Sequence, residues 1–427
     1  MKIQNHILAS LILLSGFCSG ISALASDRDT GTRIFDPRFR TLKTSLVDLF
    51  MSPPVIRLGS DDRILVSFDE IGEDRSYLQC RLVHCNSDWQ PSSLTDAEFI
   101  DGFNFAEIED IGYSSNTFVH YINYHIEIPN DHLQIIRSGN YLLEVFDPDD
   151  PDTVLLQTRF RVTENAAPVS GTATSRTDRG HNTEWQQLDF AVSIDGLDIS
   201  NPYTDLWVEL RQNDTENSTR ILRSPSRLDG SRLVYSHIPA LIYPASNEYR
   251  RFESVSNTFP GMNVDSVRWG GSNYHIFLRP DRPKADRPYE YDRTQHGRFI
   301  VREYNATDSE VGADYITVHF LLLSPRLDKD VYVDGEFTGG RLSDHNRMKY
   351  DPEAGGYRAE IPLKQGAYNY RYVTMDSRSG LPDPSDIEGN FYETENEYSV
   401  AVYLRRPGER ADRLLNHAII VSNGCYR

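Results

Sequence analysis

The chain holds few residue combinations that could perform chemistry, and the nearest to an acid–base pair is His84 with Asp88. A histidine and a carboxylate within hydrogen-bonding reach can move a proton at neutral pH. These two flank the end of an expected strand, where ordinary polar packing explains them equally well. The nucleophile pattern G-x-S-x-G, phosphate-binding glycine loops and the H-E-x-x-H metal helix are absent from the sequence. We therefore expect no enzyme, and no catalytic, cofactor-binding or metal-binding residue.

The acidic run 147–152 is the second candidate, because its four aspartates could offer oxygen ligands to Ca²⁺. It lacks the Asp/Asn spacing and the closing glutamate of a calcium loop. Its prolines, Pro148 and Pro151, favour a rigid turn between strands instead.

The first 25 residues have the pattern of an export signal. Lys2 and His6 form a weakly positive start, residues 7–14 form an apolar core, and Ala23-Leu24-Ala25 is a small-residue cleavage motif. The apolar stretch is too short to anchor stably in a bilayer core of about 30 Å. We expect cleavage after residue 25 and release of the chain beyond the inner membrane.

The negative net charge of the chain limits the kinds of partner that it can bind. The formal net charge is −19, and removal of Lys2 with the signal peptide makes it −20 (−19 − 1). Nucleic acids and anionic lipid headgroups both select clusters of Lys and Arg. The composition therefore disfavours nucleic acid and the membrane surface as partners, and we expect no direct membrane insertion.

The cysteines do not form a disulfide framework, because only Cys80, Cys85 and Cys425 follow the cleavage site. Strand alternation over residues 80–85 places the first two thiols on opposite faces. A bridge from Cys425 to one of them stays open beside the default of buried thiols. Cys18 could accept a lipid, but Phe17 stands where a lipidation motif needs a small residue, so soluble export is favoured.

Alternating or apolar runs bounded by Gly, Pro, Asn and Asp predict strands along the whole chain. The clearest are residues 63–68, 77–83, 120–128, 140–146, 188–194, 206–211, 232–235, 274–278, 315–323, 330–334, 357–361, 366–373 and 397–404. Asp334-Gly335 predicts a tight hairpin turn. No long amphipathic helical run is present in the sequence. The fold class predicted is all-β, a tandem array of Ig-like β-sandwich domains with few helices.

The composition shifts suggest where these domains end. A stretch rich in Ala, Pro, Ser and Thr at 164–182 and a proline-rich stretch at 279–283 interrupt the strand pattern. We expect a signal peptide at 1–25, an N-terminal β-sandwich at 26–165, a middle β-sandwich at 166–298 and a C-terminal Ig-like domain of the early-set type at 299–427.

Aromatic residues that lie among acidic residues predict a candidate partner-binding surface at Trp89, Phe99, Phe103 and Phe105. They lie in or beside a long expected surface loop, residues 94–111, where a short helix can begin near 92–96. The alternative is that these rings pack the loop onto its own domain. A sugar could instead stack on exposed tryptophans, but all four precede residue 270 and the last domain has none.

Three sequence motifs resemble those of a known family. They are VHCNSDWQPSSL at 83–94 with FIDGF at 99–103, NEYRRFE at 247–253 with LRPDRP at 278–283, and IEGNFYETENEY at 387–398 with VYLRR at 402–406. In this order and spacing they resemble the plug protein of the type IX secretion system of Bacteroidota, over most of residues 35–410. Residues 212–230 and 303–312 depart from the family and read as variable loops.

The resemblance implies a non-enzymatic periplasmic subunit, peripherally associated with the outer membrane. Its implied partner is the giant outer-membrane β-barrel translocon, whose periplasmic end it occludes. We carry over no contact residues. The alternative function is an exported carbohydrate-binding or hydrolase-accessory β-sandwich protein. A secreted cargo protein is a weaker third reading, since residues 423–427 show no evident sorting domain.

Overall fold

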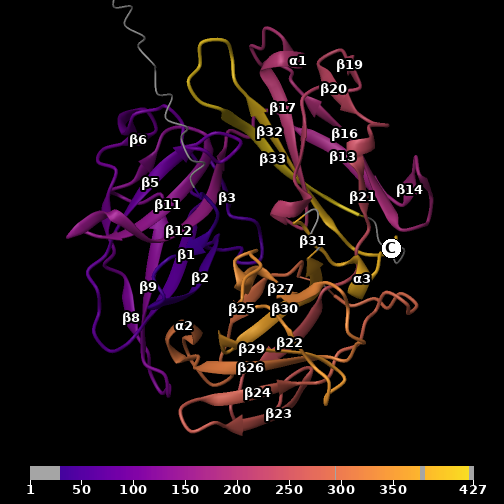
Figure 1. Cartoon of the computed structure of the whole chain (residues 1–427). Helices are drawn as coiled ribbons and strands as arrows, with labels where there is room; N and C mark the ends of the chain where they lie inside the picture. The colour runs from indigo at the N-terminus through magenta and orange to yellow at the C-terminus, as the bar shows by residue number, and fades with distance from the viewer. Residues whose placement is uncertain (1–28, 294, 376–379, 423–427) are drawn as a thin grey trace, which may run out of the picture.

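The computed structural model describes residues 29–293, 295–375 and 380–422. Within them the chain is nearly all β and forms three β-sandwiches, with helices of only a single turn (Figure 1). This confirms the predicted fold class. The expected signal peptide, together with Cys18 and Cys425, lies outside the described residues.

The first sandwich contains two facing sheets. One has the order β1-β12-β11-β5-β7 with β3 beside β12, and the other has the order β2-β4-β9-β8. The bounds are β1 (Arg33–Ile34), β2 (Phe39–Leu46), β3 (Val55–Arg57), β4 (Ile64–Ile71), β5 (Gln79–Cys85), β7 (Ala106–Glu107), β8 (Ile111–Tyr113), β9 (Tyr121–Ile128), β11 (Gly139–Asp147) and β12 (Asp150–Thr163). A short ladder of β6 (Ile100–Asp101) with β10 (Gln134–Ile135) and a 3-10 turn, η1 (Asp96–Glu98), complete it.

Alternation along the strands builds the first core. On β11, Leu143 and Val145 are fully buried and pair with Leu82 and Cys80 of β5. Cys85, five residues after Cys80, belongs to a different cluster on the opposite side of the sheet. The prediction that the two thiols occupy opposite faces is confirmed.

The second sandwich is completed by strands from the end of the chain. One sheet has the order β13-β16-β20-β19 with β21 beside β16, and the other has the order β18-β17-β32-β33. The bounds are β13 (Val169–Thr174), β16 (Trp185–Ser193), β17 (Leu206–Gln212), β18 (Arg220–Leu222), β19 (Arg227–Asp229), β20 (Arg232–Tyr235), β21 (Ile242–Pro244), β32 (Glu397–Leu404) and β33 (Arg413–Val421). Smaller elements are β14 (Arg176–Thr177), β15 (Gly180–His181), α1 (Pro202–Asp205), η2 (Glu216–Ser218) and η3 (Pro239–Leu241).

In the sequence, the third sandwich lies between the two segments that form the second sandwich. β22, β25, β27 and β31 all pair with β30, and the facing sheet has the order β23-β24-β26-β29-β28. The bounds are β22 (Arg250–Ser254), β23 (Val264–Trp269), β24 (Tyr274–Leu278), β25 (Phe299–Val301), β26 (Tyr315–Leu322), β27 (Asp330–Asp334), β28 (Lys349–Asp351), β29 (Gly356–Lys364), β30 (Gly366–Met375) and β31 (Pro382–Asp383). α2 (Ser309–Gly312), η4 (Glu336–Thr338) and α3 (Ser385–Glu388) connect them.

These pairings do not follow the expected division at residue 298. β22 and β24, placed by sequence in the middle domain, pair with β30 and β26 of the third sandwich. β32, placed by sequence in the last domain, pairs with β17 of the second sandwich from Leu206↔Leu404 to Gln212↔Tyr398. The assignment of these strands to domains was wrong because local alternation identifies a strand without identifying its partner.

Two expected turns also differ in detail. β27 ends at Asp334 and pairs with β30, so Asp334-Gly335 leads into η4 instead of forming a tight hairpin. The acidic run 147–152 does contain a turn between β11 and β12, closed by the pair Asp147↔Asp150. Residues 150–152 already belong to β12.

Candidate protein-interaction surface on the first sandwich

Trp89 lies inside the molecule, at the junction between the first and second sandwiches. It is 5% exposed, in a cluster with Cys85 and Leu142. The guanidinium groups of Arg159 and Arg161 lie 4.4 and 5.3 Å from its ring centroid, a cation–π arrangement. Its side chain therefore stabilises a junction within this chain and is not offered to a partner.

Phe99 is also buried, at 3% exposure, in the first core. Its ring lies 5.7 Å from that of His84 and 6.0 Å from that of Tyr141. The backbone before it is held by a capping box, in which the Glu98 carboxylate accepts from the backbone N–H and hydroxyl of Thr95. For Trp89 and Phe99, the alternative that the rings pack onto their own domain describes the structure.

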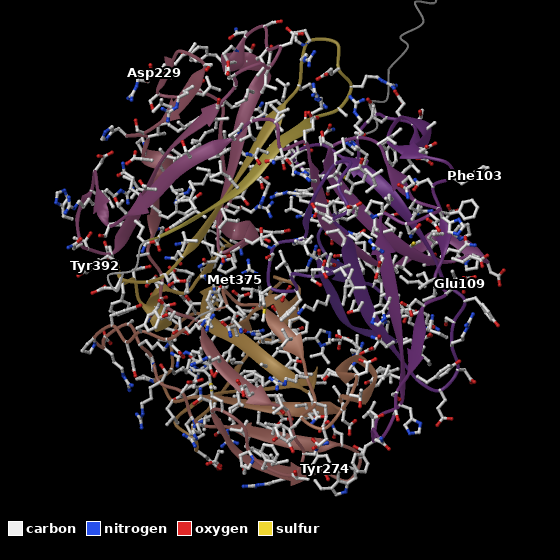
Figure 2. The ribbon with its side chains drawn as sticks, turned by 180° about the vertical axis from the view of Figure 1, so that it is seen from behind. Phe103, Glu109, Asp229, Tyr274, Met375 and Tyr392 are labelled. Carbon is white, nitrogen blue, oxygen red and sulfur yellow. The ribbon has the colours of Figure 1, made fainter. Side chains whose placement is uncertain are left out.

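Phe103 and Phe105 remain at the surface, 79% and 49% exposed, with ring centroids 6.1 Å apart. Figure 2 shows Phe103 and Glu109 at the outer rim of the first sandwich. Asn104, between the two rings, is fixed: its Oδ1 accepts from the backbone N–H of Leu82 at 2.9 Å, and its Nδ2 donates to the Leu82 carbonyl at 2.7 Å. The two phenylalanines are thus presented by a backbone that is tied to β5.

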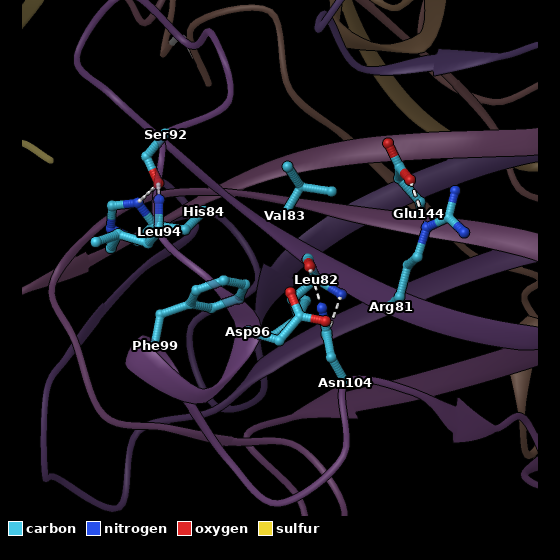
Figure 3. Close-up of a pocket in the computed structure, with 10 residues that line it drawn as sticks. All are labelled: Arg81, Leu82, Val83, His84, Ser92, Leu94, Asp96, Phe99, Asn104 and Glu144. Carbon is cyan, nitrogen blue, oxygen red and sulfur yellow. Dashed lines mark hydrogen bonds and ion pairs between the residues drawn. The ribbon is translucent and has the colours of Figure 1, made fainter. Parts of the chain in front are cut away.

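A pocket of about 270 Å³ lies beside these rings, under the chain that runs from Ser92 to Asn104 (Figure 3). It is lined by Arg81, Leu82, Val83, His84, Ser92, Leu94, Asp96, Phe99, Asn104 and Glu144. The buried Glu144 carboxylate is paired with Arg81 at 2.8 Å. Asp96 is exposed, and it has no ion-pair partner within the part of the chain that the structure describes. The pocket therefore combines apolar and polar side chains with one carboxylate, Asp96, that has no ion-pair partner among the described residues.

The proposed acid–base pair is not formed. His84 is bonded to the Ser92 hydroxyl at 2.9 Å through Nδ1 and to the Ser138 carbonyl at 3.1 Å through Nε2, while Asp88 accepts from the backbone N–H of Gln90. Burial lowers the pKa of His84 to about 4, although the Ser138 carbonyl opposes the shift. His84 is therefore a neutral histidine of the core, with both ring nitrogens hydrogen-bonded.

The tryptophans considered for sugar stacking are mostly covered. Trp207 is 5% exposed and donates from Nε1 to the Ser87 hydroxyl at 3.2 Å. Trp185 is half-buried beneath Arg179, whose guanidinium lies 4.4 Å from its ring centroid. Trp269 is 49% exposed, but its ring contacts Phe118 of the first sandwich at 4.7 Å.

Sequence reasoning missed the roles of Asn104 and Asp96. Nothing in the local sequence indicates that Asn104 bonds the backbone of a strand twenty-two residues earlier. Asp96 could have been found, since the pattern of Thr95 followed three residues later by Glu98 marks a capped turn with Asp96 in its first position.

The chain is similar to a protein-family model and, over most of its length, to a solved structure. The family model described as "Type 9 secretion system plug protein 1st domain" matches residues 39–164. A crystal structure of a hypothetical protein from Parabacteroides merdae ATCC 43184 is 33% identical, with a TM-score of 0.89, over 92% of this chain and 99% of that chain. No curated protein matches the chain.

Two other solved structures were found at low similarity. An alkylpurine DNA glycosylase of Pseudomonas fluorescens bound to DNA is 13% identical over 29% of this chain and 30% of its own, with a TM-score of 0.18. Dimeric latent PorU from Porphyromonas gingivalis is 11% identical over 90% of this chain and 34% of its own, with a TM-score of 0.14. Neither carries an argument about fold or function.

Proposed function

The chain belongs to the plug protein family of the type IX secretion system, and on that premise we propose that it occludes the periplasmic end of the outer-membrane translocon barrel. A role associated with type IX secretion follows from the family itself. Occlusion of the barrel, a periplasmic location with peripheral attachment to the outer membrane, and the absence of catalytic activity are parts of the proposal.

The observation that carries the proposal is the buried junction between the first and third sandwiches. Asp69 on β4 and Lys364 on β29 form an ion pair of 2.7 Å, and both side chains are fully buried. Tyr315 donates its hydroxyl to the same carboxylate at 2.5 Å, and Asn123 donates to its other oxygen at 2.8 Å. Opening the junction would break the ion pair and the Tyr315 hydrogen bond together, so these contacts favour one arrangement of the two sandwiches.

A second buried junction joins the first and second sandwiches. Arg161 on β12 is ion-paired with Glu209 on β17, and both are almost completely buried. Arg211 lies 3.0 Å from the same carboxylate. The Tyr403 hydroxyl on β32 donates to Asn140 of β11 at 2.8 Å. The first sandwich is therefore tied to both of the others.

A body of three sandwiches joined in this way suits occlusion of a wide opening, because it can fill space without internal hinge motion. Relative motion of domains is the default where their interface is small and polar, whereas motion at these two junctions would break the buried contacts described above. Within the described residues, no helix is long and apolar enough to span a membrane.

The test is affinity capture of the translocon. The tagged mature chain is incubated with detergent-solubilised outer membranes, and bound proteins are identified by mass spectrometry. We expect one very large barrel protein in near-stoichiometric amount. Recovery of no membrane partner by the folded chain would contradict the proposal.

A further inference from the structure

We propose that Phe103, Phe105 and the adjacent pocket form the docking surface for a basic segment of the partner barrel. In this contact a Lys or Arg side chain of the partner enters the pocket, and apolar side chains of the partner cover the two phenylalanines. The inference rests on the proposed function and specifies the chemistry of its contact.

The two phenylalanines have the properties of binding anchors. Two adjacent rings that are 79% and 49% exposed leave an apolar surface that no described residue of this chain covers. Aromatic side chains are enriched at the centres of protein interfaces, where a few of them supply most of the binding energy. Because Asn104 ties the backbone between them to Leu82, little conformational freedom remains to be lost on binding.

Charge around the rings indicates what kind of partner fits. Residues 94–111 carry six carboxylates and no Lys or Arg. Asp101, Glu107 and Glu109 are exposed, while Ala106 and Ile108 between them are buried. Phe105, Glu107 and Glu109 therefore alternate outward along one edge. A partner that covers this edge without leaving like charges opposed must be basic.

The pocket is suited to one basic side chain. Its volume of about 270 Å³ lies just below the range for small-molecule sites, which is about 300–1,000 Å³. Leu94, Val83 and Phe99 provide apolar walls for a methylene stem, and Asp96 at the surface provides a counter-charge for the head group. The nearby carboxylates Glu144 and Glu98 are already paired, with Arg81 and Arg410.

The experiment measures the affinity of the full mature chain for the detergent-solubilised barrel by biolayer interferometry at several salt concentrations. The variants are F103S/F105S and D96N. The control is L228S/D229N, whose exposed apolar and acidic pair lies on β19 in the second sandwich, on the opposite side of the molecule in Figure 2. Circular dichroism confirms that each variant is folded.

We expect F103S/F105S to weaken binding by about tenfold or more, the loss that removal of an interface anchor produces. D96N should weaken binding by a smaller factor and reduce its dependence on salt, because it removes one charge from the contact. The control should bind as the wild type does.

Three results would overturn all or part of this assignment. If the wild type captures the barrel and both variants bind with unchanged affinity, the docking surface is wrong while the proposed function stands. If only F103S/F105S loses affinity, the pocket has been wrongly assigned. If the wild type does not bind the barrel, the proposed function fails and this inference fails with it.

Discussion

Asp69 and Lys364 place two full charges where water does not reach. Lys364 also has neutral neighbours. Its ammonium group donates to the Glu310 carbonyl at 2.6 Å and lies 4.1 Å from the centroid of the Tyr121 ring. Desolvation of such a pair consumes most of its Coulombic attraction, so its main effect is to penalise any packing that buries one charge without the other. The pair therefore specifies how the first and third sandwiches meet.

At the residue scale, D69N should cost about 3–5 kcal/mol of unfolding free energy, because Lys364 stays buried without a counter-charge. The double variant D69N/K364M should recover most of this loss, since methionine fills a similar volume without charge. Urea unfolding followed by circular dichroism measures both values. A D69N variant within about 1 kcal/mol of the wild type would show that the pair does not hold the junction.

His84 gives a pH-dependent signal from the candidate surface. Burial depresses its pKa from 6.5 to about 4, so the unfolded chain takes up this proton at a higher pH than the folded chain does. The stability that this residue contributes is complete above pH 6.5 and is lost as the pH falls toward 4.

Between pH 7 and pH 4, the wild type should therefore lose about 3 kcal/mol more unfolding free energy than H84Q, which cannot titrate there. Unfolding in urea at pH 7, 5.5 and 4 gives the comparison. Parallel curves for the two proteins would mean that His84 takes up its proton at the same pH in the folded and unfolded chains.

At the scale of elements, β32 and β33 connect parts of the chain that are distant in sequence. β32 lies between β17 and β33, and it contributes Tyr398, Val400, Val402 and Leu404 to the core of the second sandwich. β33 continues onto the first sandwich, where its Leu414 carbonyl accepts from the backbone N–H of Glu164 at 3.0 Å. The second sandwich thus depends on strands that follow the third.

V402D tests this dependence, because a carboxylate at a fully buried position of the second core has no partner. We expect a loss of about 4 kcal/mol or more and faster amide hydrogen exchange in β17, with little change in β4 and β9. I419D places the same charge on β33 at a position that is 38% exposed, and it should leave exchange unchanged. Equal effects of the two variants would argue against β32 as a core strand.

The same elements show what sequence could and could not predict. β20, β24, β27 and β32 begin and end at the predicted residues, because alternation and flanking turn residues are local signals. The pairing of β32 with β17 leaves no local signal, since it joins residues about two hundred positions apart. Among the four aromatics of the candidate surface, Trp89 and Phe99 differ from Phe103 and Phe105 only in burial, which the tertiary structure decides.

At the scale of the whole molecule, the chain runs through the first sandwich, enters the second, builds the third and returns to complete the second (Figure 1). Buried ion pairs join the first sandwich to the third and to the second. Such a body can approach and leave an opening as one unit. The acidic edge with Phe103 and Phe105 lies on its outer rim, where a partner can reach it.

The most direct measurement is the electrical conductance of the purified translocon barrel in a planar lipid bilayer, before and after the mature chain is added to its periplasmic side. We expect the chain to close the open barrel, with F103S/F105S closing it only at higher concentration. A barrel that binds the chain and still conducts at its full level would contradict occlusion as the function of this protein.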